Sequence, residues 1–159
     1  MSAAWSQGLV ALALLSGGVV YGTDVFFALV ARRALRRADE ASLTQVLGHL
    51  HAVADARMPV VGATALLTTG GLFFAAGGWT TVAGRLALLA LTGMLTQLGA
   101  YLRVAQPVNR VQTAAAEQGL TPPNARALQQ RWDSVIGLRA AALTLAMAAL
   151  ISAALHLPR

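Results

Sequence analysis

Four long apolar stretches, separated by polar segments, dominate the pattern of this chain. They cover about residues 8–31, 59–77, 86–104 and 135–157. Each approaches the ~20 residues that an α-helix needs to cross the ~30 Å hydrocarbon core of a bilayer. We therefore predict an all-α integral membrane protein, folded over residues 1–159 as one up-down four-helix bundle.

The two long polar segments are expected to extend this bundle as cytoplasmic helices. Apolar residues recur at helical spacing in residues 40–57, which predicts a helix there. Asp39 or Ser42 is expected to be the N-cap of this helix. We expect Pro59 to mark the junction with the second apolar stretch, because proline is tolerated at a helix start. Glycine and two prolines in residues 118–124 predict a break, after which a helix restarts.

Composition supports a membrane location. Hydrophobic residues make up 57% of the chain and charged residues only 11%, whereas soluble domains carry about 25% charged residues. Cysteine is absent, which excludes disulfides and thiolate metal sites. The net charge of +6 comes from arginines that flank the apolar stretches, so we expect no nucleic-acid partner.

The placement of arginine predicts the orientation. Ten of the 12 basic residues fall in or beside the two long polar segments, and only Arg85 and Arg159 fall on the opposite side. The positive-inside rule then puts the polar segments in the cytoplasm. We expect a protein of the cytoplasmic (inner) membrane with both termini outside the cytoplasm. The first stretch lacks a basic flank before it, which favours a retained helix over a cleaved signal peptide.

Asp24 lies inside the first apolar stretch. A carboxylate in the centre of a bilayer costs about 2.5–3.5 kcal/mol, so it normally faces protein or water. One interpretation is a structural ion pair with Arg139 or Arg103. The other is a role in catalysis or ligand binding.

Further polar residues gather near the cytoplasmic ends of the stretches and predict a shared site there. His51 and Asp55 are four residues apart, so the carboxylate is expected to orient the imidazole on one helix face. His49 and His51 are two apart and point in different directions, so we assign no metal site. An exposed interfacial position is the alternative for both histidines, and haem or copper held by one of them stays open.

Four motifs carry a resemblance to a known family. They are GVVYGTDVFFA at residues 18–28, HAVADARMP at 51–59, QPVNR at 106–110 and RWDSVIGLR at 131–139. This pattern resembles the anthrone oxygenase-like family of small four-helix membrane proteins. The resemblance implies insertion of oxygen into an anthrone to give an anthraquinone, without a conventional cofactor.

The resemblance also implies roles for individual residues. His51, oriented by Asp55, would be the base. The carbanion formed would react with dioxygen, and arginines would stabilise the anion while Asn109 bonds a carbonyl. These arginines are Arg103, Arg110 and Arg139. The substrate would contact Tyr21, Asp24, Tyr101, Gln106 and Trp132, where Trp132 and Tyr101 can stack on a planar ring.

Two classes of function follow. The first is a membrane oxygenase or oxidoreductase that acts on an amphipathic aromatic, such as an anthrone or quinol, taken from the lipid. The second is a non-catalytic protein that binds a lipid, quinone, haem or metal, or supports a membrane partner. Glycine-lined helix faces favour a homo-oligomer in either case.

Overall fold

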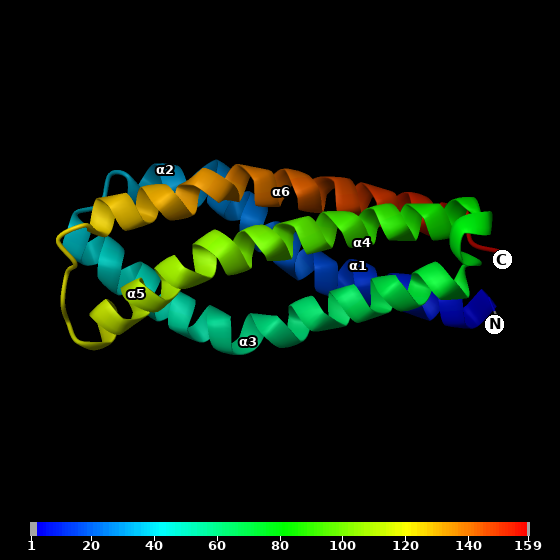
Figure 1. Cartoon of the computed structure of the whole chain (residues 1–159), viewed down its shortest axis with the longest axis horizontal. Helices are drawn as coiled ribbons and strands as arrows, with labels where there is room; N and C mark the ends of the chain where they lie inside the picture. The colour runs from blue at the N-terminus through cyan, green and yellow to red at the C-terminus, as the bar shows by residue number, and fades with distance from the viewer. Residues whose placement is uncertain (1–2, 159) are drawn as a thin grey trace.

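The computed structural model describes residues 3–158, and this part of the chain contains helices and turns but no strand (Figure 1). The helices are α1 (Ala3–Phe26), η1 (Phe27–Ala31), α2 (Arg32–Leu35), α3 (Glu40–Ala75), η2 (Gly78–Thr80), α4 (Val82–Ala100), η3 (Tyr101–Ala105), α5 (Gln106–Glu117) and α6 (Ala125–Leu155). They join into four continuous rods, Ala4–Leu35, Glu40–Ala75, Val82–Glu117 and Ala125–Leu155, each long and apolar enough to cross a membrane. The prediction of an all-α chain with four such helices is confirmed.

The four rods lie side by side along the longest axis of the molecule (Figure 1). The marked ends of the chain lie at one end, beside the α3–α4 turn, and the other two connections lie at the opposite end. We call these the terminal end and the loop end. The break in residues 118–124 is confirmed: α5 ends at Glu117, Gly119 adopts a positive φ of 66°, and α6 starts at Ala125.

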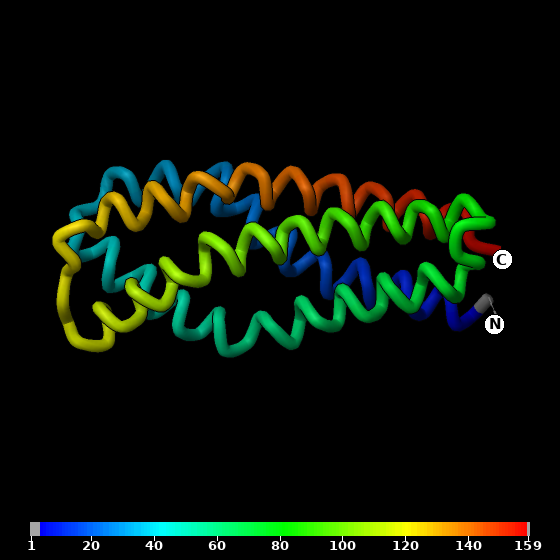
Figure 2. Tube along the Cα trace, in the orientation of Figure 1, coloured from blue at the N-terminus to red at the C-terminus, as the bar shows by residue number. Residues whose placement is uncertain are grey.

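The rod formed by α3 differs from the prediction. Pro59 does not begin a helix but lies inside the 36-residue α3, and Asp39 caps this helix by accepting the Ser42 amide at 2.9 Å. Proline has no N–H, so the carbonyl of Asp55, four residues earlier, has no helical donor. Such a site bends a helix, and α3 changes direction midway along its length (Figure 2).

Two π-helical segments interrupt the first and the third rod. η1 follows α1, and η3 separates α4 from α5. Pro107 is the second residue after η3 and removes the helical donor for the Arg103 carbonyl, which accounts for a wider turn at η3. A π turn shifts the side chains that follow it around the helix and is frequent at functional sites. Both segments lie where the polar residues of the first and third rods gather.

Buried apolar residues form two clusters. The cluster toward the terminal end is built largely from alanines, with Leu72, Leu143 and Leu150. The cluster toward the loop end contains larger side chains, including Phe27, Trp132 and Ile136. In sequence, the buried side chain Asp24 falls between the two clusters, whereas the buried Arg139 falls within the loop-end cluster, between Ile136 and Ala140.

Gly48 permits α5 to lie against α3. A Cβ at Gly48 would collide with the Gln112 carbonyl oxygen and the Ala116 Cβ, and Thr113 Oγ1 donates to the Gly48 carbonyl at 3.1 Å. We expect Gly48→Ala to destabilise the protein by about 1–3 kcal/mol through overpacking. Thermal unfolding in detergent measures this. Gly137→Ala is the matched control, since a Cβ there meets open space, and equal stability of the two variants would contradict the proposed α3–α5 contact.

Candidate functional site

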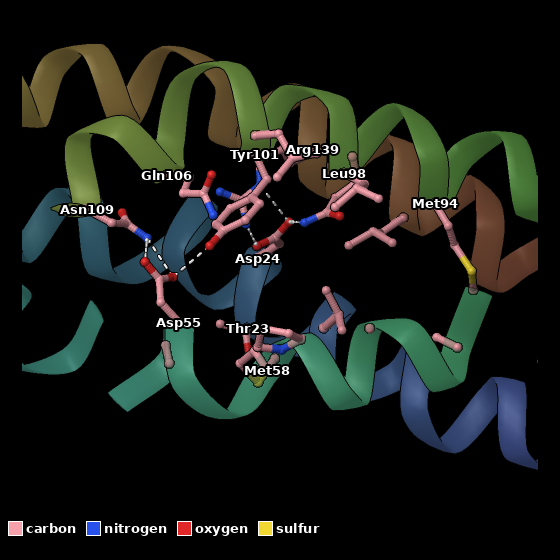
Figure 3. Close-up of a pocket in the computed structure, with 18 of the residues that line it drawn as sticks. Thr23, Asp24, Asp55, Met58, Met94, Leu98, Tyr101, Gln106, Asn109 and Arg139 are labelled. Atoms are coloured by element: carbon pink, nitrogen blue, oxygen red, sulfur yellow. Dashed lines mark hydrogen bonds and ion pairs between the residues drawn. The ribbon is translucent and has the colours of Figure 1, made fainter. Parts of the chain in front are cut away.

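A cavity of about 410 Å³ lies between the four rods and receives side chains from each of them. Its walls are mainly apolar, and they include Leu66, Leu98, Leu143, Met58 and Met94. Phe27, Tyr101 and Trp132 add aromatic surface. The polar lining residues come from opposite sides, with α3 on one side and α4, η3 and α5 on the other (Figure 3). The volume falls within the ~300–1,000 Å³ that is usual for small-molecule sites.

Asp24 forms a buried ion pair with Arg139. Arg139 Nη2 lies 2.6 Å from Asp24 Oδ1, and Arg139 Nε donates to Oδ2 at 3.1 Å. Gln97 Nε2 donates to the same Oδ2 at 3.3 Å. Both ionised side chains are over nine-tenths buried. Of the two partners that the sequence offered for Asp24, the structure therefore selects Arg139 from α6.

The Arg139 guanidinium lies between aromatic rings. Its carbon Cζ is 5.4 Å from the centroid of Trp132 and 5.6 Å from that of Tyr101, distances at which a cation is attracted to a ring face. Two of its nitrogens bind Asp24, while Nη1 is buried without a hydrogen-bond partner. Arg139 thus holds a spare donor inside the cavity wall.

Asp55 is the centre of a second polar network. Its Oδ1 accepts from the Tyr101 hydroxyl at 2.8 Å and from Asn109 Nδ2 at 3.0 Å (Figure 3). Asn109 Oδ1 in turn accepts from Trp132 Nε1 at 3.0 Å. The bonds join α3, η3, α5 and α6 and fix the Trp132 ring beside the cavity.

His51 is buried, with 4% of its surface exposed, and it lines the cavity. The predicted hydrogen bond to Asp55 is not formed, because Asp55 is turned toward Tyr101 and Asn109. Within residues 3–158, both ring nitrogens lack a partner. The imidazole instead stacks on Trp132, with centroids 5.9 Å apart and planes at 27°. A buried imidazole without partners is costly, so a ligand with a donor or acceptor would be favoured here.

The structure brings some predicted site residues together and leaves others apart. His51, Asp55, Asn109, Arg139, Asp24, Tyr101, Gln106 and Trp132 line the cavity. Arg103, Arg110 and His49 are exposed, and Tyr21 packs half-buried against the terminal-end cluster. None of these four lines the cavity, so the candidate site is defined without them.

Histidine, cysteine and carboxylate side chains are the usual protein ligands of metal ions. Residues 3–158 contain no group of three or more histidine, cysteine, aspartate or glutamate side chains placed to hold a metal ion. His49 is exposed and His51 is buried. Haem or copper held by one of the two histidines stays a prediction.

Three buried glutamines were missing from the predicted site. Gln97 bonds Asp24, and Gln112 and Gln129 bond each other. Each lies three or four residues from a predicted site residue on its own helix: Tyr101, Asn109 and Trp132 respectively. Helical spacing alone could have found them, because such positions share a helix face.

The chain matches no protein-family model, and comparisons with curated proteins and with solved structures also find no match. The resemblance carried by the four motifs therefore stays a prediction.

Proposed function

We propose that this chain is an integral protein of the cytoplasmic membrane, with its cavity at the inner hydrocarbon boundary. Support comes from the exposed surface of each rod. On each rod an exposed apolar residue is followed toward the loop end by an exposed polar one: Val30 by Arg33, Val60 by Arg57, Leu102 by Arg103 and Leu138 by Ser134. Beyond these positions, toward the loop end, Val46, Leu50, Val53 and Val111 are also exposed. Val82 and Leu102 are 20 residues apart, which corresponds to ~30 Å of helix and to the thickness of the hydrocarbon core.

In this placement the loop end is cytoplasmic and both termini are outside. The arginine excess at the loop end supports this orientation. Trp5 and Trp79 are each 67% exposed near the other end, where tryptophan commonly lies at the interface. Tyr101 is next to Leu102 in the chain, and Arg139 is next to Leu138. These two cavity residues therefore lie at the hydrocarbon boundary. The exposed lining residues Pro59 and Leu102 would give a ligand access from the lipid.

The ligand that fits this cavity is an amphipathic planar aromatic. Apolar walls and the rings of Phe27 and Trp132 suit its body. Arg139 Nη1 and the His51 nitrogens are buried polar atoms without partners. A carbonyl or enolate oxygen of the ligand would accept a hydrogen bond from Arg139 Nη1. An acidic O–H or C–H group of the ligand would face a His51 ring nitrogen. Anthrones have both a carbonyl oxygen and an acidic CH₂ group, and quinols offer acidic O–H groups.

We propose oxygenation as the reaction. Neutral His51 removes a proton from a CH₂ group adjacent to the rings, and Arg139 Nη1 stabilises the resulting enolate oxygen. The carbanion carbon bonds to dioxygen, and the hydroperoxide loses water to form a carbonyl. The balance is R₂CH₂ + O₂ → R₂C=O + H₂O, in which the carbon loses the electrons that dioxygen gains. The observation that carries this proposal is that one cavity is lined by His51 and Arg139, whose ring nitrogens and Nη1, respectively, are buried without a partner among the described residues.

Oxygen uptake tests the reaction. The purified chain in lipid nanodiscs is given an anthrone in an oxygen electrode, with empty nanodiscs measuring spontaneous oxidation. We expect faster uptake with protein, one dioxygen consumed for each anthraquinone formed. Uptake equal to that in empty nanodiscs would contradict an oxygenase and leave the non-catalytic binding protein as the alternative.

A further inference from the structure

A chain of buried amides leads from the loop-end surface toward His51. Gln129 Nε2 donates to Asp133 Oδ1 at 2.9 Å, and Gln112 Nε2 donates to Gln129 Oε1 at 3.3 Å. Gln112 and Gln129 are 1% and 4% exposed. Asp133 is only partly buried and lines a surface hollow with Arg36. The chain therefore connects a solvent-accessible carboxylate to the interior.

The direction of this chain is set by its outer end. An ionised carboxylate only accepts hydrogen bonds, so Gln129 must present its NH₂ group to Asp133. The side-chain oxygen of Gln129 then faces Gln112, so Gln112 must donate to it through its own NH₂ group. The remaining oxygen of Gln112, Oε1, is buried without a partner.

His51 is the neighbour that this oxygen can serve. On α3, His51 lies between Gly48, which packs against Gln112, and Asp55, which accepts a hydrogen bond from Asn109, so His51 and Gln112 lie at the same level of facing helices. Among the described residues, both ring nitrogens of His51 and Gln112 Oε1 are buried without a partner. Gly48 lets α5 approach α3 closely at Gln112, one helical turn from His51. The charged groups that act on the imidazole are Asp55 on α3 and Arg139 on α6, and neither bonds to it. An N–H of His51 would satisfy two buried polar groups at once.

We infer that Asp133 is a positioning residue that sets the tautomer of His51 through Gln129 and Gln112. The ring nitrogen facing Gln112 carries the proton, and the other nitrogen keeps its lone pair for the cavity. In neutral imidazole only the unprotonated nitrogen accepts a proton. The consequence for catalysis rests on the proposed function of His51 as a base, but the tautomer itself does not.

Nitrogen-15 NMR of histidine-labelled protein in detergent measures this tautomer directly, at a pH where imidazole is neutral. We expect His51 to give one strongly protonated and one unprotonated ring nitrogen, with His51→Gln assigning the signals. The exposed His49 and His156 serve as internal references. In Asp133→Asn the amide can bond Gln129 in either direction, so both His51 signals should shift toward each other as the tautomers mix.

Two variants control this experiment. Asp133→Glu keeps an acceptor-only group and should retain the wild-type pattern, and Glu117→Gln changes an exposed acid outside the chain. Should Asp133→Asn fail to fold, Gln112→Met removes the acceptor beside His51 and is expected to mix the tautomers as well.

The outcomes separate this inference from the proposed function. A folded Asp133→Asn or Gln112→Met protein with an unchanged His51 pattern overturns the inference, whatever the protein binds. A single His51 tautomer that mixes in these variants supports it even where no anthrone is oxidised. In that case only the proposed reaction fails.

Discussion

Arg139→Met is expected to destabilise the folded chain by about 3–5 kcal/mol, the usual cost of removing one partner from a buried ion pair. The substitution leaves the Asp24 carboxylate 2% exposed with only Gln97 as a hydrogen-bond donor. It also removes the cation that packs on the Tyr101 and Trp132 rings. Thermal unfolding in detergent, followed by circular dichroism, measures the loss. Arg103→Met is the matched control, because Arg103 is exposed and outside the cavity.

The double variant Asp24→Leu with Arg139→Met tests the pairing itself. With both charges removed, no ionised group remains uncompensated at this site, so most of the lost stability should return. A double variant as unstable as the sum of the two single variants would argue against a coupled pair.

His51→Gln is expected to lower the rate of anthrone oxidation by about 10²–10⁴-fold, the usual contribution of a general base. Glutamine keeps a polar side chain in the cavity but cannot take the proton. The loss should appear in kcat, with KM nearly unchanged, because the aromatic walls that hold the substrate stay in place. Oxygen uptake at several anthrone concentrations separates the two constants.

Arg110→Gln serves as the control for this result. Arg110 is exposed and does not line the cavity, so its rate should equal that of the unmodified protein. Equal rates for His51→Gln and the unmodified protein would rule out His51 as the base. A larger loss of rate in Arg110→Gln than in His51→Gln would indicate that the active site lies at the loop-end arginines instead of in the cavity.

The helices were predictable because membrane-length apolar runs leave little choice of structure. The bend in α3 could not be predicted, because a proline such as Pro59 is compatible both with the start of a helix and with a bend inside one. The same limit applies to Arg103 and Arg110, which share a face with Gln106 in an ideal helix. The structure has a π segment at η3, and only Gln106 of the three lines the cavity.

The candidate site shows a second limit. Spacing along one helix grouped His51 with Asp55, and both line the cavity, but spacing could not rank partners from other helices. His51 and Asp55 are correctly placed near the same cavity, yet Tyr101 and Asn109 bind the carboxylate from across it. For Asp24 the long-range partner could be named from charge, because few cations lie near the cavity and burial demands one.

Fluorescence of Trp132 tests the central claim, that the cavity binds an amphipathic planar aromatic. Trp5→Phe with Trp79→Phe leaves Trp132 as the sole tryptophan, and a hydroxyanthraquinone is titrated into the protein in nanodiscs. The account predicts saturable quenching that is lost when Ala54→Phe fills the cavity and kept in Leu95→Phe, which adds the same ring on an exposed face. Quenching that never saturates, or that Ala54→Phe leaves unchanged, would contradict a binding site in this cavity.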